Sequence, residues 1–126
     1  MLTATKPMQL VCLYPLEMTT LEGDAYVYMF IDAFSDFLMV TGIEKKEGDP
    51  DILKHIALLT QNKDFSAHSC KPFLIVLHKY AGLLPAINAL LAPLGGGATV
   101  SDETVAYYMA PALEAFYKNM AKKSLD

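Results

Sequence analysis

Two aspartates interrupt an otherwise apolar stretch of the chain, residues 30–40, which reads FIDAFSDFLMV. Carboxylates supply the hard oxygen ligands that divalent metal ions prefer, so Asp32 and Asp36 are candidates for a metal-dependent active site. Asp and Ser are also standard turn residues, because their short side chains accept hydrogen bonds from nearby backbone N–H groups. We therefore expect Asp32 to accept a hydrogen bond from the turn around Ser35, and Asp36 to stay solvated at its tip.

The residues on either side of this turn have the character of β-strands. Residues 25–34 and 37–46 are rich in aromatic and β-branched side chains. The connection between them is so short that the two strands must be antiparallel. Upstream, residues 8–14 form a continuous apolar run between Pro7 and Pro15, which predicts a short buried strand that ends at Pro15.

The second half of the chain alternates between helical and strand patterns. Asp49 as the capping residue and Pro50 in the first helical position predict a helix that continues to about residue 61. The remaining predicted elements are a strand over 71–80, a helix over 83–94, a short strand over 98–100, and a last helix from Ser101 to about Lys123 with a break or kink at Pro111.

This order of elements predicts a fold of the α/β class. Three antiparallel strands come first, and two further strands are reached through helical crossovers, which gives a five-stranded mixed sheet flanked by helices. No repeat or linker-like segment divides the 126 residues. We therefore expect a single domain over residues 1–126.

The composition argues against several classes of function. The formal net charge is −4 and every basic residue is a lysine, so the chain lacks the arginine fork that binds phosphate or guanine through two parallel hydrogen bonds. Strong binding to nucleic acid is therefore not expected. Cys12 and Cys70 are isolated thiols, and no apolar run is long enough to cross a bilayer. We expect a cytoplasmic protein without membrane contact.

The order of elements and four local motifs resemble the ribonuclease H-like catalytic core of retroviral-type integrases and related transposases. The motifs are MQLVCLYPLEM for the first strand, FIDAFSDFLMV for the hairpin, PFLIVLHKYAGLL for the fourth strand, and APALEAFYKNMAKK for the helix near the end. The resemblance covers nearly the whole chain. It implies two divalent cations held by three carboxylates: one on the first strand, one just after the fourth, and one on the helix near the end.

Carried over to this sequence, the three carboxylate positions fall on Val11, His78 and Glu114, so only Glu114 is an acid. Valine has no ligand atom, and imidazole suits zinc better than magnesium. A single carboxylate cannot hold two magnesium ions, so we expect no metal, no other cofactor and no catalysis. Asp32 matches a different acid, which commonly lies in the hairpin of this family and is not a metal ligand.

The resemblance and the replaced acids together predict a catalytically inactive, integrase-core-like domain from a mobile-element family. Cores of this family commonly dimerise, so we expect a homodimer or a complex with an integrase-like protein partner. Two alternatives stay open. The first is an active metal-dependent polynucleotidyl transferase or nuclease, in which Asp32, Asp36 or Asp102 supplies a displaced acid. The second is an unrelated α/β binding module that shares only the order of strands.

For two of these residues a structural role is the simpler interpretation. Glu114 stands four residues before Lys118, which is the spacing of an exposed ion pair on a helix. His78 and Cys12 are both zinc-binding residue types, but their spacing matches no known zinc pattern. We therefore expect His78 to be an ordinary, satisfied histidine at the end of a strand.

Overall fold

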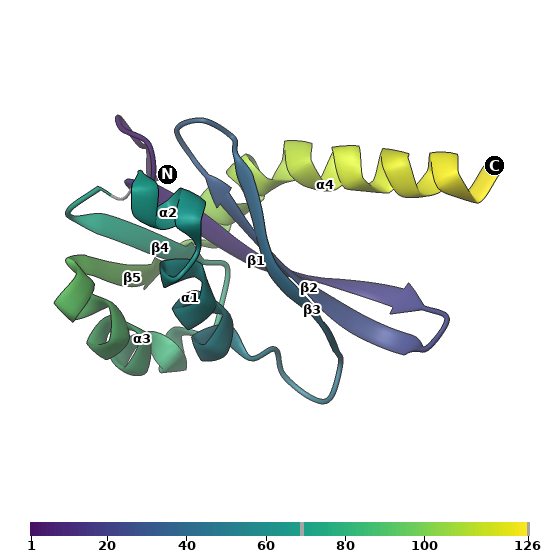
Figure 1. Cartoon of the computed structure of the whole chain (residues 1–126), viewed down its shortest axis with the longest axis horizontal. Helices are drawn as coiled ribbons and strands as arrows, with labels where there is room; N and C mark the ends of the chain where they lie inside the picture. The colour runs from purple at the N-terminus through teal and green to yellow at the C-terminus, as the bar shows by residue number, and fades with distance from the viewer. Residues whose placement is uncertain (69, 126) are drawn as a thin grey trace.

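The computed structural model describes the backbone of residues 1–68 and 70–125 and the side chains of residues 1–68 and 70–119. Figure 1 shows a twisted sheet with helices on both of its sides. The strands are β1 (Leu10–Thr20), β2 (Gly23–Asp32), β3 (Leu38–Lys45), β4 (Phe73–Leu77) and β5 (Gly96–Val100). The helices are α1 (Ile52–Thr60), α2 (Lys63–Ala67), α3 (Leu84–Leu91) and α4 (Asp102–Leu125), with the short 3-10 helices η1 (Ala81–Leu83) and η2 (Ala92–Leu94).

The sheet has the predicted mixed topology. Its order is β3-β2-β1-β4-β5; β2 is antiparallel to both β1 and β3, whereas β4 is parallel to β1 and β5 is parallel to β4. The first three strands follow one another through short turns, and the last two are reached through helices, as parallel pairing requires. The α/β fold class is thus confirmed, and an all-parallel, doubly wound sheet is excluded.

Different helices cover the two faces of the sheet. On one face, Val11 of β1 packs in a buried cluster with Ile56 of α1 and Ile87 of α3. On the other face, Cys12 packs in a second cluster with Met109 of α4. Because residues 10–16 of β1 lie between the two clusters, this part of the strand is a continuous apolar run rather than an alternating one.

Strand β1 is longer than the sequence predicts. It continues through Pro15 to Thr20, with Pro15 level with Tyr28 of β2. Pairing between β1 and β4 ends at Leu13 and Leu77, so beyond that point one side of β1 is open and needs no backbone donor. A proline is tolerated there, and the expectation that Pro15 ends the strand is wrong.

Two of the predicted helices also differ in detail. Asp51, and not Asp49, is the N-cap of α1, because the Asp51 side chain accepts a hydrogen bond from the backbone N–H of Lys54. Helix α4 continues through Pro111 without the predicted break. Figure 1 shows its second half projecting beyond the body of the sheet.

The two outer strands of the sheet have irregular edges. On β5, Asn88 of α3 binds the backbone of Ala98: Asn88 Oδ1 accepts from the N–H at 2.8 Å, and Nδ2 donates to the carbonyl at 3.4 Å. On β3, a β-bulge leaves Thr41 without a partner in β2, since its neighbours Val40 and Gly42 are both paired.

Candidate functional site

The two aspartates of the β2–β3 hairpin lie in different environments. Asp32 is fully buried, and its carboxylate accepts hydrogen bonds from the backbone N–H of Phe34 (3.2 Å) and the hydroxyl of Ser35 (2.7 Å). A third hydrogen bond comes from the backbone N–H of Met8 at 3.1 Å. Asp36 is exposed in the turn. The prediction that Asp32 is a turn residue is confirmed, and its contact with Met8 also ties the hairpin to the segment before β1.

At the carboxyl end of β4, the pairing between β1 and β4 stops while β1 continues, and this is the kind of sheet edge where ligands commonly bind. The two strands pair up to Leu13 and Leu77, so the next residues, Tyr14 and His78, are neighbours. Their ring centroids are 5.2 Å apart and their planes are tilted by 58°. Tyr80 meets His78 edge-on at 5.6 Å. Aromatic rings therefore occupy this edge of the sheet.

A cavity of about 310 Å³ lies between Tyr14, His78 and the first half of α4, and its α4 side consists of Asp102 and apolar residues. Burial lowers the pKa of His78, Lys79 lowers it further, and Asp102 acts in the opposite direction. The imidazole is therefore neutral at pH 7. A cavity with one carboxylate and a neutral imidazole offers too few oxygen ligands for two hard cations.

The structure does not bring together the three positions that the resemblance implies. Val11 is buried on the face that α1 and α3 cover, and it pairs with Ile75, three residues before His78. The residue beside His78 is Tyr14. Glu114 is exposed on α4, where its carboxylate lies 3.1 Å from Lys118 Nζ. The predicted ion pair between Glu114 and Lys118 is confirmed.

The donor atoms of this region do not suit a metal ion. Cys12 is fully buried, and burial raises the pKa of its thiol to about 12, so the side chain is a protonated thiol at pH 7. Within residues 1–68 and 70–125, no group of three or more His, Cys, Asp or Glu side chains is placed to hold a metal. The residues present do not fit the two-cation site of integrase cores.

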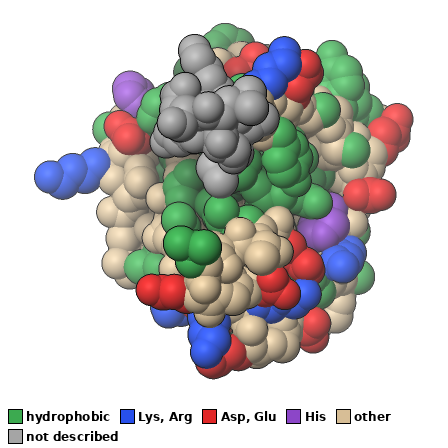
Figure 2. Space-filling model, turned by 90° about the vertical axis from the view of Figure 1, so that its right-hand side faces the viewer, with side chains coloured by type: hydrophobic (Ala, Val, Ile, Leu, Met, Phe, Trp, Pro, Cys, Tyr) green, Lys and Arg blue, Asp and Glu red, His purple; other side chains and the backbone are tan. Residues whose placement is uncertain are grey.

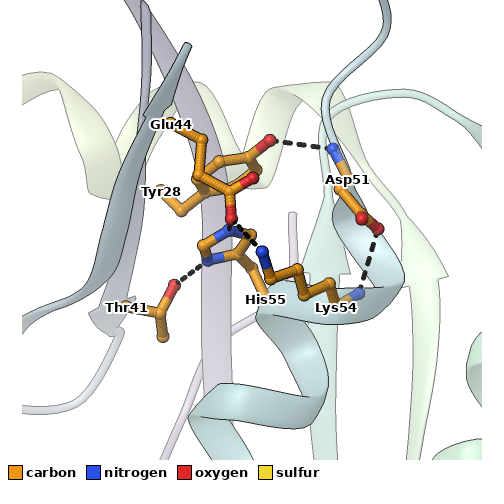
Figure 3. A network of polar contacts seen from close by, with 6 residues as sticks. All are labelled: Tyr28, Thr41, Glu44, Asp51, Lys54 and His55. Atoms are coloured by element: carbon orange, nitrogen blue, oxygen red, sulfur yellow. Dashed lines mark hydrogen bonds and ion pairs between the residues drawn. The ribbon is translucent and has the colours of Figure 1, made fainter.

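A second polar cluster, which the sequence did not predict, joins β2, β3 and α1 (Figure 3). His55 is 1% exposed; its Nδ1 lies 2.6 Å from Thr41 Oγ1, and its Nε2 lies 2.8 Å from the Glu44 carboxylate. The imidazole stacks on the ring of Tyr28, with 3.5 Å between centroids and 3° between planes. Lys54 Nζ binds the same Glu44 oxygen at 2.6 Å. Every polar atom of the imidazole therefore has a partner.

The β-bulge of β3 is what allows this cluster to form. Thr41 is the extra residue of the bulge, so its side chain can turn toward His55. Gly42 leaves the space that the imidazole needs, because a Cβ at this position would lie 3.1 Å from His55 Cε1. A glycine inside a strand is the one signal in the sequence that indicates such a bulge or close approach.

Glu44 makes the cluster sensitive to acid. Its pKa is lowered, first by the hydrogen bond from Lys54 and then by the one from His55. The contribution of Glu44 to stability is therefore complete above its ordinary pKa of 4.5 and is lost as the pH falls through the lower folded value. We expect Glu44→Gln to flatten the acid limb of the pH–stability curve, measured by urea unfolding on either side of that pH.

Lys54→Gln tests why the pKa of Glu44 is low, because the hydrogen bond from Lys54 lowers that pKa more than the one from His55 does. This variant should flatten the same limb partially. If both variants lost stability at acid pH just as the wild-type chain does, carboxyl groups other than Glu44 would be responsible for that loss.

Two solved structures are similar to this chain in fold. The HTLV-2 integrase catalytic core domain, solved in complex with magnesium in a trimeric form, is similar with a TM-score of 0.64 and 16% sequence identity; the match covers 95% of this chain and 73% of that chain. A chain of the simian T-cell lymphotropic virus intasome in complex with PP2A regulatory subunit B56 gamma is similar with a TM-score of 0.60 and 13% identity. That match covers 86% of this chain and 43% of the other.

These similarities define the class of fold. The chain has the ribonuclease H-like fold of retroviral integrase catalytic cores, with a five-stranded mixed sheet between helices. No protein-family model and no curated protein sequence matches it. In the described part of the chain, none of the helices combines the length and the apolar character needed to cross a bilayer.

Proposed function

We propose that this chain is an integrase-core-like domain that has lost catalysis and acts as a self-association or partner-binding module. The observation that carries the proposal is the contact between Tyr14 and His78, which fills the place where the pairing between β1 and β4 ends. This pair presents a hydroxyl and an imidazole, and not the carboxylates that magnesium requires. The trimeric form of the HTLV-2 core domain supports self-association by analogy of fold.

Introducing carboxylates at this cavity tests whether the lack of acids is what prevents metal binding there. In a Tyr14→Asp/His78→Asp double variant, two introduced carboxylates would line the same cavity as Asp102. We expect this variant to gain saturable Mn²⁺ binding in calorimetric titration, and we expect the wild-type chain to show none.

The matched control is His78→Asp alone, which supplies one introduced carboxylate fewer and should bind Mn²⁺ much more weakly. If the wild-type chain bound Mn²⁺ as tightly as the double variant, the proposal that the metal site has been lost would be wrong. Sedimentation of the wild-type chain then tests the second half of the proposal, and a strictly monomeric chain that captures no integrase-like protein would contradict it.

One observation favours the alternative of an active enzyme. Of the three acids that could be displaced ligands, Asp102 is the one that lines the cavity beside His78, whereas Asp32 is committed to the hairpin. Mn²⁺-dependent cleavage of DNA by the wild-type chain, abolished by Asp102→Asn, would establish this alternative and overturn the proposal above.

A further inference from the structure

Three large apolar side chains, those of Leu38, Val40 and Ile43, form an exposed row on the outer strand β3, and we call this row the β3 stripe. Their exposed fractions are 37%, 47% and 63%. Each pairs with a residue of β2 whose side chain is buried in the cluster under α4. The β3 stripe is therefore the uncovered margin of the apolar face that α4 covers. Exposed apolar patches of this kind mark interaction surfaces.

The β-bulge creates the stripe. In a regular strand, side chains alternate between the two faces, so Val40 and Ile43, three residues apart, would point in opposite directions. The extra residue Thr41 places both on the α4 face, beside Met29 and Val27 of β2. The bulge also interrupts the hydrogen-bonding edge of β3, which disfavours edge-to-edge pairing. A partner is therefore expected on the face of β3 and not along its edge.

The described side chains of α4 pack over β1 and β2, and the β3 stripe beside them is exposed. Figure 2 views the molecule from the side toward which α4 projects, and it shows hydrophobic side chains lining a hollow with acidic and basic side chains around it. A helix adds a layer about 10 Å thick, and stacked sheets are also about 10 Å apart. A second sheet placed over the stripe would therefore lie level with α4 and pack beside it.

The charges at the two ends of the stripe are self-complementary. Asp36 precedes the stripe in the exposed turn. Lys45 follows it on the same face of β3 as Ile43, with its exposed Nζ 4.0 Å from the exposed Glu47 carboxylate. Between them, residues 37–43 carry no charge, and the carboxylate of Glu44 binds His55 of α1 on the opposite face. If a two-fold axis passes through the middle of the strand, the second β3 runs antiparallel to the first. Each Asp36 then meets the Lys45 of the other copy.

We propose that the β3 stripe binds the β3 stripe of a second copy of this chain, face to face and antiparallel. The arrangement is isologous, so the same surface serves both copies and the assembly closes as a dimer. The stripe forms the apolar centre, and the two pairs of Asp36 with Lys45 form the polar rim. This inference rests on the proposed self-association and names the surface that carries it.

Sedimentation equilibrium of single-site variants tests the surface. Val40→Lys places a charge in the apolar centre and is expected to raise the dissociation constant by roughly a hundredfold. The matched control is Leu94→Lys, at a position of similar exposure (41%) in η2, which should leave the dissociation constant unchanged. Thermal unfolding of both variants verifies that they are folded.

A charge test addresses the antiparallel orientation. Lys45→Glu places two acids opposite each other and should weaken the dimer roughly tenfold. Asp36→Asn removes the repulsion while suiting the left-handed backbone (φ 63°), so adding it to Lys45→Glu should strengthen the dimer again.

The outcomes separate this inference from the proposed function. A dimer that Val40→Lys leaves intact would overturn the surface but keep self-association. If Val40→Lys weakened the dimer but Asp36→Asn failed to strengthen the Lys45→Glu dimer again, the surface would stand and the antiparallel arrangement would be wrong. A wild-type chain that stays monomeric at every concentration would overturn both the inference and the self-association on which it rests.

Discussion

Replacing Asp32 by alanine is expected to lower the free energy of unfolding by about 3 kcal/mol. The substitution removes a fully buried carboxylate that accepts hydrogen bonds from the N–H groups of Met8 and Phe34 and from the Ser35 hydroxyl. The N–H of Met8 would then stay buried without a partner, because Met8 is only 3% exposed. Urea unfolding followed by circular dichroism measures the effect.

Two aspartate-to-asparagine variants serve as controls. Asp32→Asn keeps one acceptor oxygen but turns an NH₂ group toward a set of donors, so it should lose less stability than Asp32→Ala. Asp36→Asn alters an exposed turn residue and should change stability by under about 0.5 kcal/mol. If Asp32→Ala were as stable as Asp36→Asn, the carboxylate of Asp32 would not anchor the hairpin.

Replacing His55 by alanine is expected to cost about 3 kcal/mol of stability, because it removes a buried ring and breaks a hydrogen-bond network. The ring is stacked on Tyr28 and bonded at both nitrogens, to Thr41 and to Glu44. The variant should also release β3 from α1. Amide hydrogen exchange along β3 is therefore expected to accelerate more than exchange along β1.

His68→Ala is the matched control, because His68 is an exposed histidine and its loss should leave stability nearly unchanged. Thr41→Val keeps the shape of the side chain at the bulge but removes its hydroxyl. Its free energy of unfolding should lie between those of His55→Ala and His68→Ala. Similar unfolding curves for His55→Ala and His68→Ala would show that the cluster does not hold β3 in place.

The hairpin between β2 and β3 was predictable because its determinants are local. The apolar strands, the short connection and the turn residues Asp32 and Ser35 lie within a few positions of one another, and each favours the same structure. The mixed topology of the sheet was predictable for a related reason, since the lengths of the connections decide which strands are antiparallel and which are reached by crossovers. The contact of Asp32 with Met8 was not predicted, because it depends on how β1 is placed beside the hairpin.

Features that depend on pairing between distant strands were not predictable. The length of β1 past Pro15 depends on where β4 ends, at Leu77. The neighbour of His78 is Tyr14 instead of Val11 because the register of β1 against β4, and the alternation of side chains between faces, decide which residues meet. Sequence motifs do not fix that register.

The contact between Asn88 and Ala98 has a consequence for the protein at high concentration. The amide of Asn88 hydrogen-bonds both the N–H and the carbonyl of Ala98 at the outer edge of β5. These two backbone groups are therefore not available to pair with a strand of another chain. The opposite border is broken by the bulge at Thr41. Neither border is a good template for the endless stacking of chains that produces amyloid. We therefore expect assemblies of this protein to be finite in size and to dissolve on dilution.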